Sequence, residues 1–524
     1  MGEPIDRLLR LNDGPIMNQL PIELLLQIFE SVLGPCDPDH GLKYYHHLCT
    51  LSRVCTRWYS IVHRSPQLWT TVPGIIKEEG LRKILERSSS KHIDIEFNSK
   101  EVENEPDAEG QITTFFDILG TAPERWRTLN LTLCRSATLE RQTRDFLQIP
   151  APNLERLRFE NTWLPLRARD VEFFTRNCPN LKDIHIFGGS YTWSQAVFKG
   201  LEILKLTYLE FKNVEPILDT IRPLSQLRKL EICQCSIYGE LSAPTQPVSL
   251  PNLQLLRVEF DQEGDVKIPT KQFLDRISAP PPCPLYTSLD NGDGEEVEGS
   301  VAETFCEWLF GRQTKVVLGG VERLTLGFSR PEIDAYERSL VAFGLYSGSA
   351  NIKGGFEGSQ MRDVLYVLEY IQGLFQRSNA SETFTKLTVS GDRATLLNDS
   401  EIIASFTALP PITHLELIQP ELSSDNFPSE DLSDSERLGS NTAPYSKIKN
   451  VVLREVPPDG ILDIVLGALG DSRERAPSIS EWGVEDLDHV EIHVEEKNFH
   501  EVEAVVEAFR NNPRIGKVDL YVAL

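Results

Sequence analysis

The fold of this 524-residue chain is decided by a short motif, of which residues 201–206, LEILKL, are one copy. The motif has the form apolar-x-x-apolar-x-apolar and here consists of Leu201, Leu204 and Leu206. Alternating apolar positions are typical of a strand with one buried face, so a single copy indicates only a half-buried strand. The motif becomes informative because it recurs along the chain.

Thirteen copies between residues 126 and 520 indicate an array of similar units. Neighbouring copies in the first group begin 20 to 28 residues apart, which is close to the period of leucine-rich repeats. This group consists of Trp126-Leu129-Leu131, Leu154-Leu157-Phe159, Leu181-Ile184-Ile186, Leu201-Leu204-Leu206, Leu227-Leu230-Ile232 and Leu253-Leu256-Val258. The second group consists of Val321-Leu324-Leu326, Leu340-Phe343-Leu345, Phe384-Leu387-Val389, Ile412-Leu415-Leu417, Ile448-Val451-Leu453, Leu487-Val490-Ile492 and Ile515-Val518-Leu520.

Helical stretches separate many of the copies. They are expected within residues 167–177, 213–221, 361–377 and 498–512. Strand, turn and helix in repetition build a right-handed parallel solenoid. We therefore predict an α/β fold, in which a leucine-rich-repeat horseshoe has a parallel sheet on its concave face and helices on its convex face.

The predicted array is degenerate. Only Cys134 and Cys235 provide the Asn or Cys that leucine-rich repeats have three residues after the third apolar position. Long intervals and acidic, serine-rich composition predict loop insertions near residues 286–300 and 420–445. A first, imperfect strand is expected at Ile93 and Ile95, after a linking helix that starts at Gly80.

The part of the chain before the array has helical segments of its own. Residues 21–33, PIELLLQIFESVL, predict a helix that begins with Pro21 and ends at Gly34. A second helical run starts at Leu51 and breaks at Pro66. Because about 50 residues cannot bury two broadly apolar helices among themselves, apolar surface must remain. That surface either binds a partner or packs on the next domain as a cap.

The apolar residues of this segment occur in a definite order. The order is Leu20-Pro21-x-Glu23-Leu24-Leu25-x-x-Ile28-Phe29, Leu48, Leu51, Val54-Cys55-x-x-Trp58 and Pro66-x-Leu68-Trp69. It resembles the F-box family, whose three-helix module docks on a Skp-type adaptor held by a cullin scaffold with a RING subunit. The resemblance implies that the hydrophobic pattern positions face either the adaptor or the core of the module. The candidate adaptor-binding residues are Leu20, Pro21, Leu24, Ile28, Val54, Cys55 and Trp58.

Two further features qualify this resemblance. The link between Leu33 and Leu48 is longer than is usual in the family, whereas the helix and the stretch SSSKHIDIEF that follow resemble large fungal families of F-box proteins. We predict a flexible segment at 1–17, an F-box at 18–72, a linking helix with a first irregular repeat at 73–100, and a leucine-rich-repeat-like solenoid at 101–524.

Composition restricts the class of protein. A formal charge of -25 opposes a polyphosphate backbone, so nucleic acid is not an expected partner. The chain shows neither a secretory signal nor an apolar run long enough to cross a membrane, and its nine cysteines follow no disulfide framework. A cytoplasmic or nuclear protein with reduced thiols and no membrane partner is expected.

Sequence motifs for chemistry are missing. Cys36, His40, His46, His47 and Cys49 follow no spacing typical of a zinc site. No phosphate-binding glycine loop, metalloprotease helix or nucleophile elbow occurs. We therefore predict no catalytic residue, no metal and no cofactor.

The residue between the last two apolar positions of each motif is expected to point out of the core. Reading these positions gives a basic first half, which Arg156 and Lys229 two places earlier on their strands reinforce, and acidic charges later, at Glu416, Glu491 and Asp519. A surface that binds an acidic or phosphorylated segment is one interpretation. The other is that Arg158 and Arg257 pair with neighbouring glutamates. The candidate substrate-binding residues are Arg156, Arg158, His185, Lys205, Lys229 and Arg257.

Two functions fit these features. The chain is either the substrate-recognition subunit of a cullin-RING ubiquitin ligase or a scaffold that binds partners without promoting ubiquitin transfer. In both, its contribution is to bring proteins together and not to catalyse a reaction itself.

Overall fold

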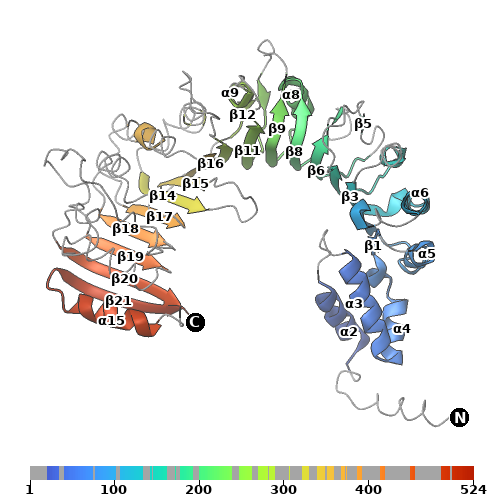
Figure 1. The fold of residues 1–524 in the computed structure, drawn as a ribbon, viewed down its shortest axis with the longest axis horizontal. Helices are drawn as coiled ribbons and strands as arrows, with labels where there is room; N and C mark the ends of the chain where they lie inside the picture. Colours follow the sequence, from blue (N-terminus) through green and yellow to red (C-terminus); the bar gives the residue numbers. More distant parts are fainter. Residues whose placement is uncertain are drawn as a thin grey trace, which may run out of the picture. The chain divides into compact units, whose positions relative to one another are not determined.

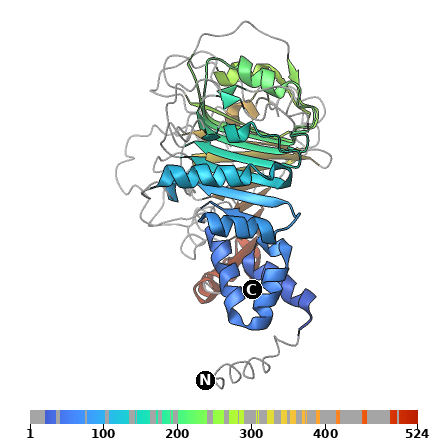
Figure 2. The same cartoon turned by 90° about the vertical axis from the view of Figure 1, so that its right-hand side faces the viewer.

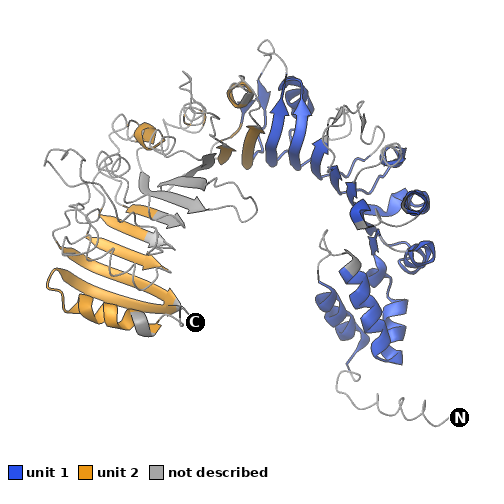
Figure 3. Cartoon of the chain, viewed as in Figure 1, with its two compact units in different colours: residues 1–253, 276–278 blue, residues 254–275, 279–524 orange. Residues whose placement is uncertain are grey.

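The structure, a computed structural model, divides into two compact units, which we describe separately (Figure 3). Unit 1 comprises residues 1–253 and 276–278, and unit 2 comprises residues 254–275 and 279–524. The residues described are 20–34, 41–74, 77–101, 107–133, 142–143, 145–161, 171–172, 178–189, 191–192, 200–238, 247–261, 269–280, 283–288, 306, 308, 321–329, 339–347, 351–358, 367–371, 373, 386–391, 413–418, 449–454, 486–495 and 499–523. The predicted flexible segment at 1–17 and the predicted insertion at 420–445 lie outside them.

Unit 1 begins with a helical module (Figure 1). Its elements are α2 (Ile22–Leu33), α3 (Gly41–Val54), α4 (Thr56–Arg64) and η2 (Pro66–Trp69). The predicted first helix is confirmed, with Pro21 before it and Gly34 after it at a φ of 72°. The single run predicted from Leu51 is wrong, because Cys55 is extended and its Sγ accepts a hydrogen bond from the Trp58 backbone N–H.

The module packs around the apolar stripe of α2 formed by Leu25, Phe29 and Leu33. Their four-residue spacing places them on one side of the helix. The ring of Phe29 meets the Trp58 ring of α4 edge to face, with centroids 4.8 Å apart. The buried partners from the other helices include Leu48, Leu51, Ile61 and Val62.

The end of the module is joined to the sheet of unit 1. Trp69 donates its indole N–H to the Val62 carbonyl at 2.7 Å, and the Arg87 guanidinium lies 4.3 Å from the Trp69 ring centre. The chain then enters β1 (Thr71–Pro73), α5 (Glu78–Arg87) and β2 (Ile93–Asn98). β1 pairs in parallel with β2, so the module leads directly into the sheet. β2 contains the strand expected at Ile93 and Ile95.

The strands of unit 1 form a parallel sheet in the order β1, β2, β3, β4, β6, β8 and β9. The remaining bounds are β3 (Trp126–Leu133), β4 (Arg156–Asn161), β6 (Asp183–Gly189), β8 (Ile203–Phe211) and β9 (Lys229–Ile237). All the motif residues of the first group are buried, as their alternation predicts. α5, α6 (Ala108–Leu119) and α8 (Glu215–Ile221) cover one side of this sheet (Figures 1 and 2).

Short elements complete unit 1. They are η3 (Ser99–Glu101), η4 (Pro123–Arg125), the parallel pair β5 (Val171–Glu172) and β7 (Tyr191–Thr192), and the parallel pair β10 (Val248–Ser249) and β12 (Ile277–Ser278). The helix predicted over 167–177 is wrong at 171–172, which form β5, and its other residues lie outside the described ranges. The helix predicted within 213–221 is confirmed as α8.

Three neighbouring strands of unit 1 bend at the same register position. Gly188, Tyr208 and Gln234 have φ values of 72°, 54° and 51° and directly follow register partners on β6, β8 and β9. One step beyond the bend of β9, the Cys235 thiol donates to the Leu206 carbonyl on the adjacent strand at 3.6 Å. Cys235 is a residue that the repeat pattern singled out, whereas Cys134 lies outside the described residues.

Unit 2 contains a mixed sheet in the order β11, β13, β16, β15, β14, β17, β18, β19, β20 and β21. Their bounds are β11 (Leu255–Asp261), β13 (Leu285–Ser288), β14 (Val321–Ser329), β15 (Ser339–Ser347), β16 (Asn351–Gly358), β17 (Lys386–Gly391), β18 (His414–Ile418), β19 (Asn450–Arg454), β20 (Leu487–Glu495) and β21 (Ile515–Ala523). α9 (Pro269–Asp275) and α15 (Phe499–Arg510) are its helices with complete described bounds.

The expectation of a wholly parallel sheet is wrong in unit 2, because β15 runs antiparallel to both β14 and β16. Residues 286–288, predicted to begin a loop insertion, lie in β13, and residues 289–300 lie outside the described ranges. Residues 367–371 and 373, within a predicted helical stretch, are helical. The chain is thus a mixed α/β protein with a small helical N-terminal region, and the leucine-rich-repeat horseshoe stays a prediction. No described helix is both long and apolar enough to span a bilayer.

Candidate partner-binding surfaces

α2 has two adjacent apolar stripes with opposite environments. Leu25, Phe29 and Leu33 are buried, whereas Leu24 and Val32 are 44% and 55% exposed. Ile28, between these two in the same four-residue series, is half-buried. An apolar stripe with two exposed residues and one half-buried residue on a small module is typical of a surface that another protein covers.

The structure separates the other predicted adaptor-binding residues into two groups. Pro21 is exposed and Val54, at the end of α3, is 52% exposed. Leu20, Cys55 and Trp58 are half-buried. Trp58 packs on Phe29 and Cys55 caps α4, so these two make contacts within the module, whereas Pro21, Leu24 and Val54 are exposed.

Sequence reasoning missed Val32, an exposed residue to which the four-residue spacing from Leu24 points. Ile22 and Tyr59 are also exposed and were not among the candidate contacts. Arg57 was also missed, and it donates a 2.6 Å hydrogen bond to the Leu20 carbonyl, which ties the start of α4 to the start of α2.

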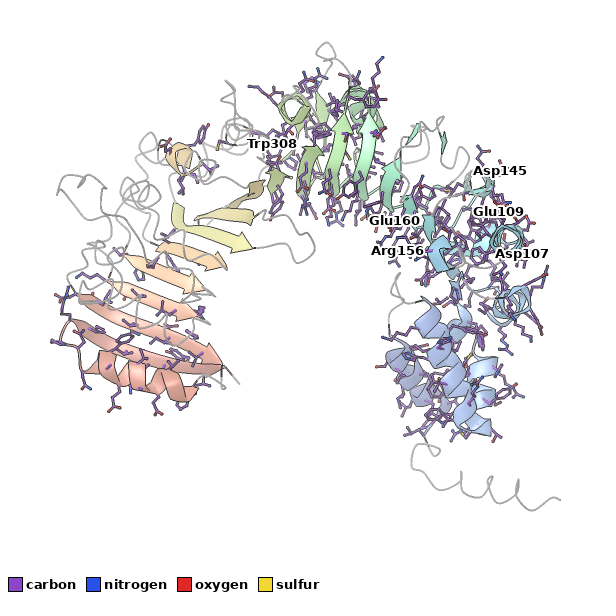
Figure 4. The ribbon with its side chains drawn as sticks, viewed as in Figure 1. Asp107, Glu109, Asp145, Arg156, Glu160 and Trp308 are labelled. Carbon is purple, nitrogen blue, oxygen red and sulfur yellow. The ribbon has the colours of Figure 1, made fainter. Side chains whose placement is uncertain are left out.

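The second candidate surface is the side of the unit 1 sheet opposite α5, α6 and α8, which we call the open face. Figure 4 shows Arg156 and Glu160 on this side of β4 and Glu109 of α6 on the other. The sheet register aligns one residue from each of β3, β4, β6, β8 and β9 into a row across the open face. The row is Asn130, Arg158, His185, Lys205 and Glu231.

Carboxylates on the open face neutralise much of its basic charge. Lys229 contacts Glu231 at 2.7 Å, and Lys205 contacts the same carboxylate at 3.5 Å. Arg158 lies 3.7 Å from Glu160. Arg156 is exposed and pairs in register with Asp183. The open face is therefore less basic than the sequence indicates, as expected from the interpretation that pairs arginines with neighbouring glutamates.

His185 differs from the other residues of the row because burial and the charges of Lys205 and Arg158 lower its pKa to about 4. The imidazole is therefore neutral near pH 7. Its Nε2 is buried and has no hydrogen-bond partner among the described residues. The Thr207 hydroxyl, on the neighbouring strand of the same face, is likewise buried without a partner there.

Arg257, the remaining candidate, belongs to unit 2. It lies on β11 and donates from its Nε to the buried Glu259 carboxylate on the same strand.

The acidic half of the pattern is also neutralised. Glu416 accepts hydrogen bonds from Lys386 and Arg454, at 2.7 and 2.8 Å, and from Thr388 at 3.1 Å. Burial raises the pKa of Glu416, but these donors outweigh it and lower the pKa to about 2. Glu491 contacts His493, and Asp519 contacts His489 and Lys517. Arg454 was missed because it lies outside the motif, and Lys386 was missed although it occupies the same place two residues before the read position as Arg156 and Lys229.

Burial makes two of the described cysteines unsuited to chemistry. It raises the pKa of the Cys178 thiol to about 11 and that of Cys283 to about 12, so both are protonated and poor nucleophiles at neutral pH. Within the described ranges, no cluster of histidine, cysteine and carboxylate side chains is arranged to hold a metal ion.

The lowered pKa of His185 predicts a pH-dependent loss of stability. Because the folded-state pKa lies below the unfolded value, the neutral ring stabilises unit 1 above pH 6.5 and this stabilisation is lost as the pH falls toward 4. Between pH 7 and 5 the wild type should lose about 1 kcal/mol more than His185→Gln, allowing for partial exposure of the ring. Hydrogen exchange of β6 and β8 amides measures this, and equal losses in both proteins would contradict the prediction.

Comparison with known families agrees with the geometry of the helical module. Residues 17–72 match the F-box-like family model, which begins one residue before the predicted boundary. No curated protein matches the chain. The match covers the four helical elements and the exposed stripe of α2, and it ends within β1.

Proposed function

From its F-box-like module at residues 17–72, we propose that this chain is the substrate-recognition subunit of a cullin-RING ubiquitin ligase. The module binds a Skp-type adaptor, as F-box domains generally do, and the sheet units bind the protein to be ubiquitinated. Binding of a cullin scaffold through the adaptor and binding of a substrate protein are both part of this proposal.

The observation that carries the proposal is the apolar stripe of α2 formed by the exposed Leu24 and Val32 with the half-buried Ile28, which lies beside the buried stripe. Leaving this much apolar side chain in water costs free energy that docking on an adaptor recovers, at about 25 cal/mol for each Å² buried. Pro21, directly before α2, and Val54, at the end of α3, are also exposed.

The attachment of the module to the sheet supports a role in positioning. Trp69, held by Val62 and Arg87, lies directly before β1, and β1 pairs with β2. An adaptor bound to α2 and a protein bound to unit 1 would then be held on one compact body. Holding two reactants together raises their effective concentration, which is the contribution that a receptor subunit makes to transfer.

Binding of the purified full-length chain to a Skp-type adaptor tests the first step. We expect a one-to-one complex that recruits a cullin scaffold, measured by calorimetry and by light scattering after gel filtration. Val54→Asp should weaken the complex, whereas Tyr238→Asp, at an exposed aromatic residue after β9, is the matched control and should not. No binding by the folded wild-type chain would refute the proposal.

Degradation of the captured protein distinguishes a ligase receptor from a scaffold that only binds its partners. A protein captured by the chain should be degraded in cells in a manner that depends on the cullin and is blocked by Val54→Asp. Stable capture without cullin-dependent turnover would favour a scaffold that binds partners without ubiquitin transfer.

A further inference from the structure

We propose that the open face of unit 1 binds an anionic oxygen group on a partner peptide, held by His185, Thr207, Arg158 and Lys205. The group is the carboxylate of an acidic residue or the phosphate of a modified one. This proposal rests on the proposed function, because it names the chemistry by which the receptor holds its substrate.

Two unpartnered polar atoms mark the position. The Nε2 of His185 on β6 and the hydroxyl of Thr207 on β8 are both buried and lack partners among the described residues. Their strands are adjacent, with His185 opposite Lys205 and Phe187 opposite Thr207, so the two side chains are diagonal neighbours on the same face. Buried polar groups in native proteins are nearly always hydrogen-bonded, so two on one surface indicate a missing ligand.

The neighbouring cations are only loosely engaged. The distances of 3.7 Å from Arg158 to Glu160 and 3.5 Å from Lys205 to Glu231 exceed those of normal hydrogen bonds. Glu231 makes its short contact with Lys229 instead. Arg158 and Lys205 are 37% and 38% exposed and therefore keep N–H groups for a ligand.

The side chains around this position are hydrogen-bond donors, so the ligand that they bind must be a hydrogen-bond acceptor. Arg158 and Lys205 can only donate, Thr207 can donate through its hydroxyl, and a neutral His185 can donate through Nε2 when that nitrogen carries the proton. A group with several acceptor oxygens satisfies all of them together. Charge-assisted hydrogen bonds of this kind are about twice as strong as neutral ones.

Features of the chain favour a peptide as the carrier of this group. The net charge of -25 disfavours a long polyanion such as nucleic acid, whereas one or two anionic side chains need only local complementarity. Phe187 lies two residues from His185 on the same face, and its ring meets that of Tyr208 with centroids 4.9 Å apart. These rings provide apolar contact for the peptide beside its anionic group.

The test uses the full chain and three degenerate peptide libraries that differ only in a fixed central residue. This residue is alanine, glutamate or phosphoserine, and retention on the immobilised chain is measured. We expect the glutamate or the phosphoserine library to be retained about tenfold more than the alanine library, since a hydrogen bond to a charged group is worth at least that factor. The better of the two identifies the source of the oxygen group.

Substitutions at Thr207 and Lys205 test whether the preference for anionic peptides arises at this position. Thr207→Val removes the hydroxyl at nearly constant volume, and Lys205→Gln removes one charge. Each should lower the preference for the anionic library about fivefold or more. Lys212→Gln, which removes the charge of an exposed lysine just after β8, is the matched control and should retain the full preference. Thr207→Val should remain folded, because it removes a buried hydroxyl that has no partner in the described structure.

The outcomes are distinguishable from failure of the proposed function. Equal retention of the three libraries, or a preference that persists in Thr207→Val and Lys205→Gln, would overturn the inference. Adaptor binding is measured on the same preparations. A chain that binds the adaptor without an anion preference loses only this inference, and one that prefers anions without binding the adaptor loses only the ligase assignment.

Discussion

Leu24→Asp is expected to abolish capture of a Skp-type adaptor while the chain stays folded, whereas Leu25→Asp is expected to unfold the helical module. The two residues are adjacent in sequence but belong to different stripes of α2. Leu24 is 44% exposed, and Leu25 is fully buried. An aspartate at position 24 remains hydrated in the free chain and is desolvated only under the adaptor, so its cost falls on binding.

The expected magnitudes differ accordingly. Leu24→Asp should weaken adaptor binding about 100-fold or more while changing the free energy of unfolding by less than about 1 kcal/mol. Leu25→Asp should cost at least about 4 kcal/mol, because it removes core contacts and buries a carboxyl group. Calorimetry measures the affinity, and hydrogen exchange of α2–α4 amides measures folding. Wild-type affinity in a folded Leu24→Asp chain would show that the exposed stripe is not the adaptor surface.

Gly188→Ala is expected to destabilise unit 1 by more than about 3 kcal/mol, whereas Gly34→Ala, which meets only a backbone penalty, should cost about 1 to 3 kcal/mol. Both glycines have a φ of 72°, a backbone conformation that disfavours a residue with a side chain, so each substitution carries a backbone penalty. They differ in their surroundings. A Cβ at Gly188 would lie 2.1 Å from the Asn161 carbonyl oxygen of β4, whereas a Cβ at Gly34 would meet no atom within 4 Å.

The clash at Gly188 involves backbone and cannot be relieved by turning a side chain. Relief requires β4 and β6 to move apart, which breaks the ladder that aligns the open face. Hydrogen exchange of β4 and β6 amides, with the thermal midpoint of the whole chain, measures the effect. Equal and small losses in the two variants would show that the bend at Gly188 is not required for pairing of these strands.

Positions that depend on local pattern were predicted well. The first-group motif residues are buried and α2 runs between Pro21 and Gly34, because alternation and helix-end preferences act over a few residues. The second helical run was predicted incorrectly because the Cys55 side chain caps a new helix, an interaction that apolar spacing does not report. The antiparallel β15 was also missed, because a strand motif contains no information about direction.

In the candidate surfaces, too, some features follow from the local sequence pattern and others depend on tertiary contacts. The sequence alone determined that Arg158, His185 and Lys205 leave the core of the sheet, because side-chain direction follows from backbone periodicity. It did not determine which apolar residues of the module are exposed, and the tertiary structure decided that Leu24 and Val54 are. Only the tertiary structure decided the state of the sheet residues. Register between strands 20 or more residues apart brings Glu231 to Lys205, and burial beside two cations keeps His185 neutral. Charge pairing and desolvation depend on neighbours in space, and these neighbours exist only once the strands have paired.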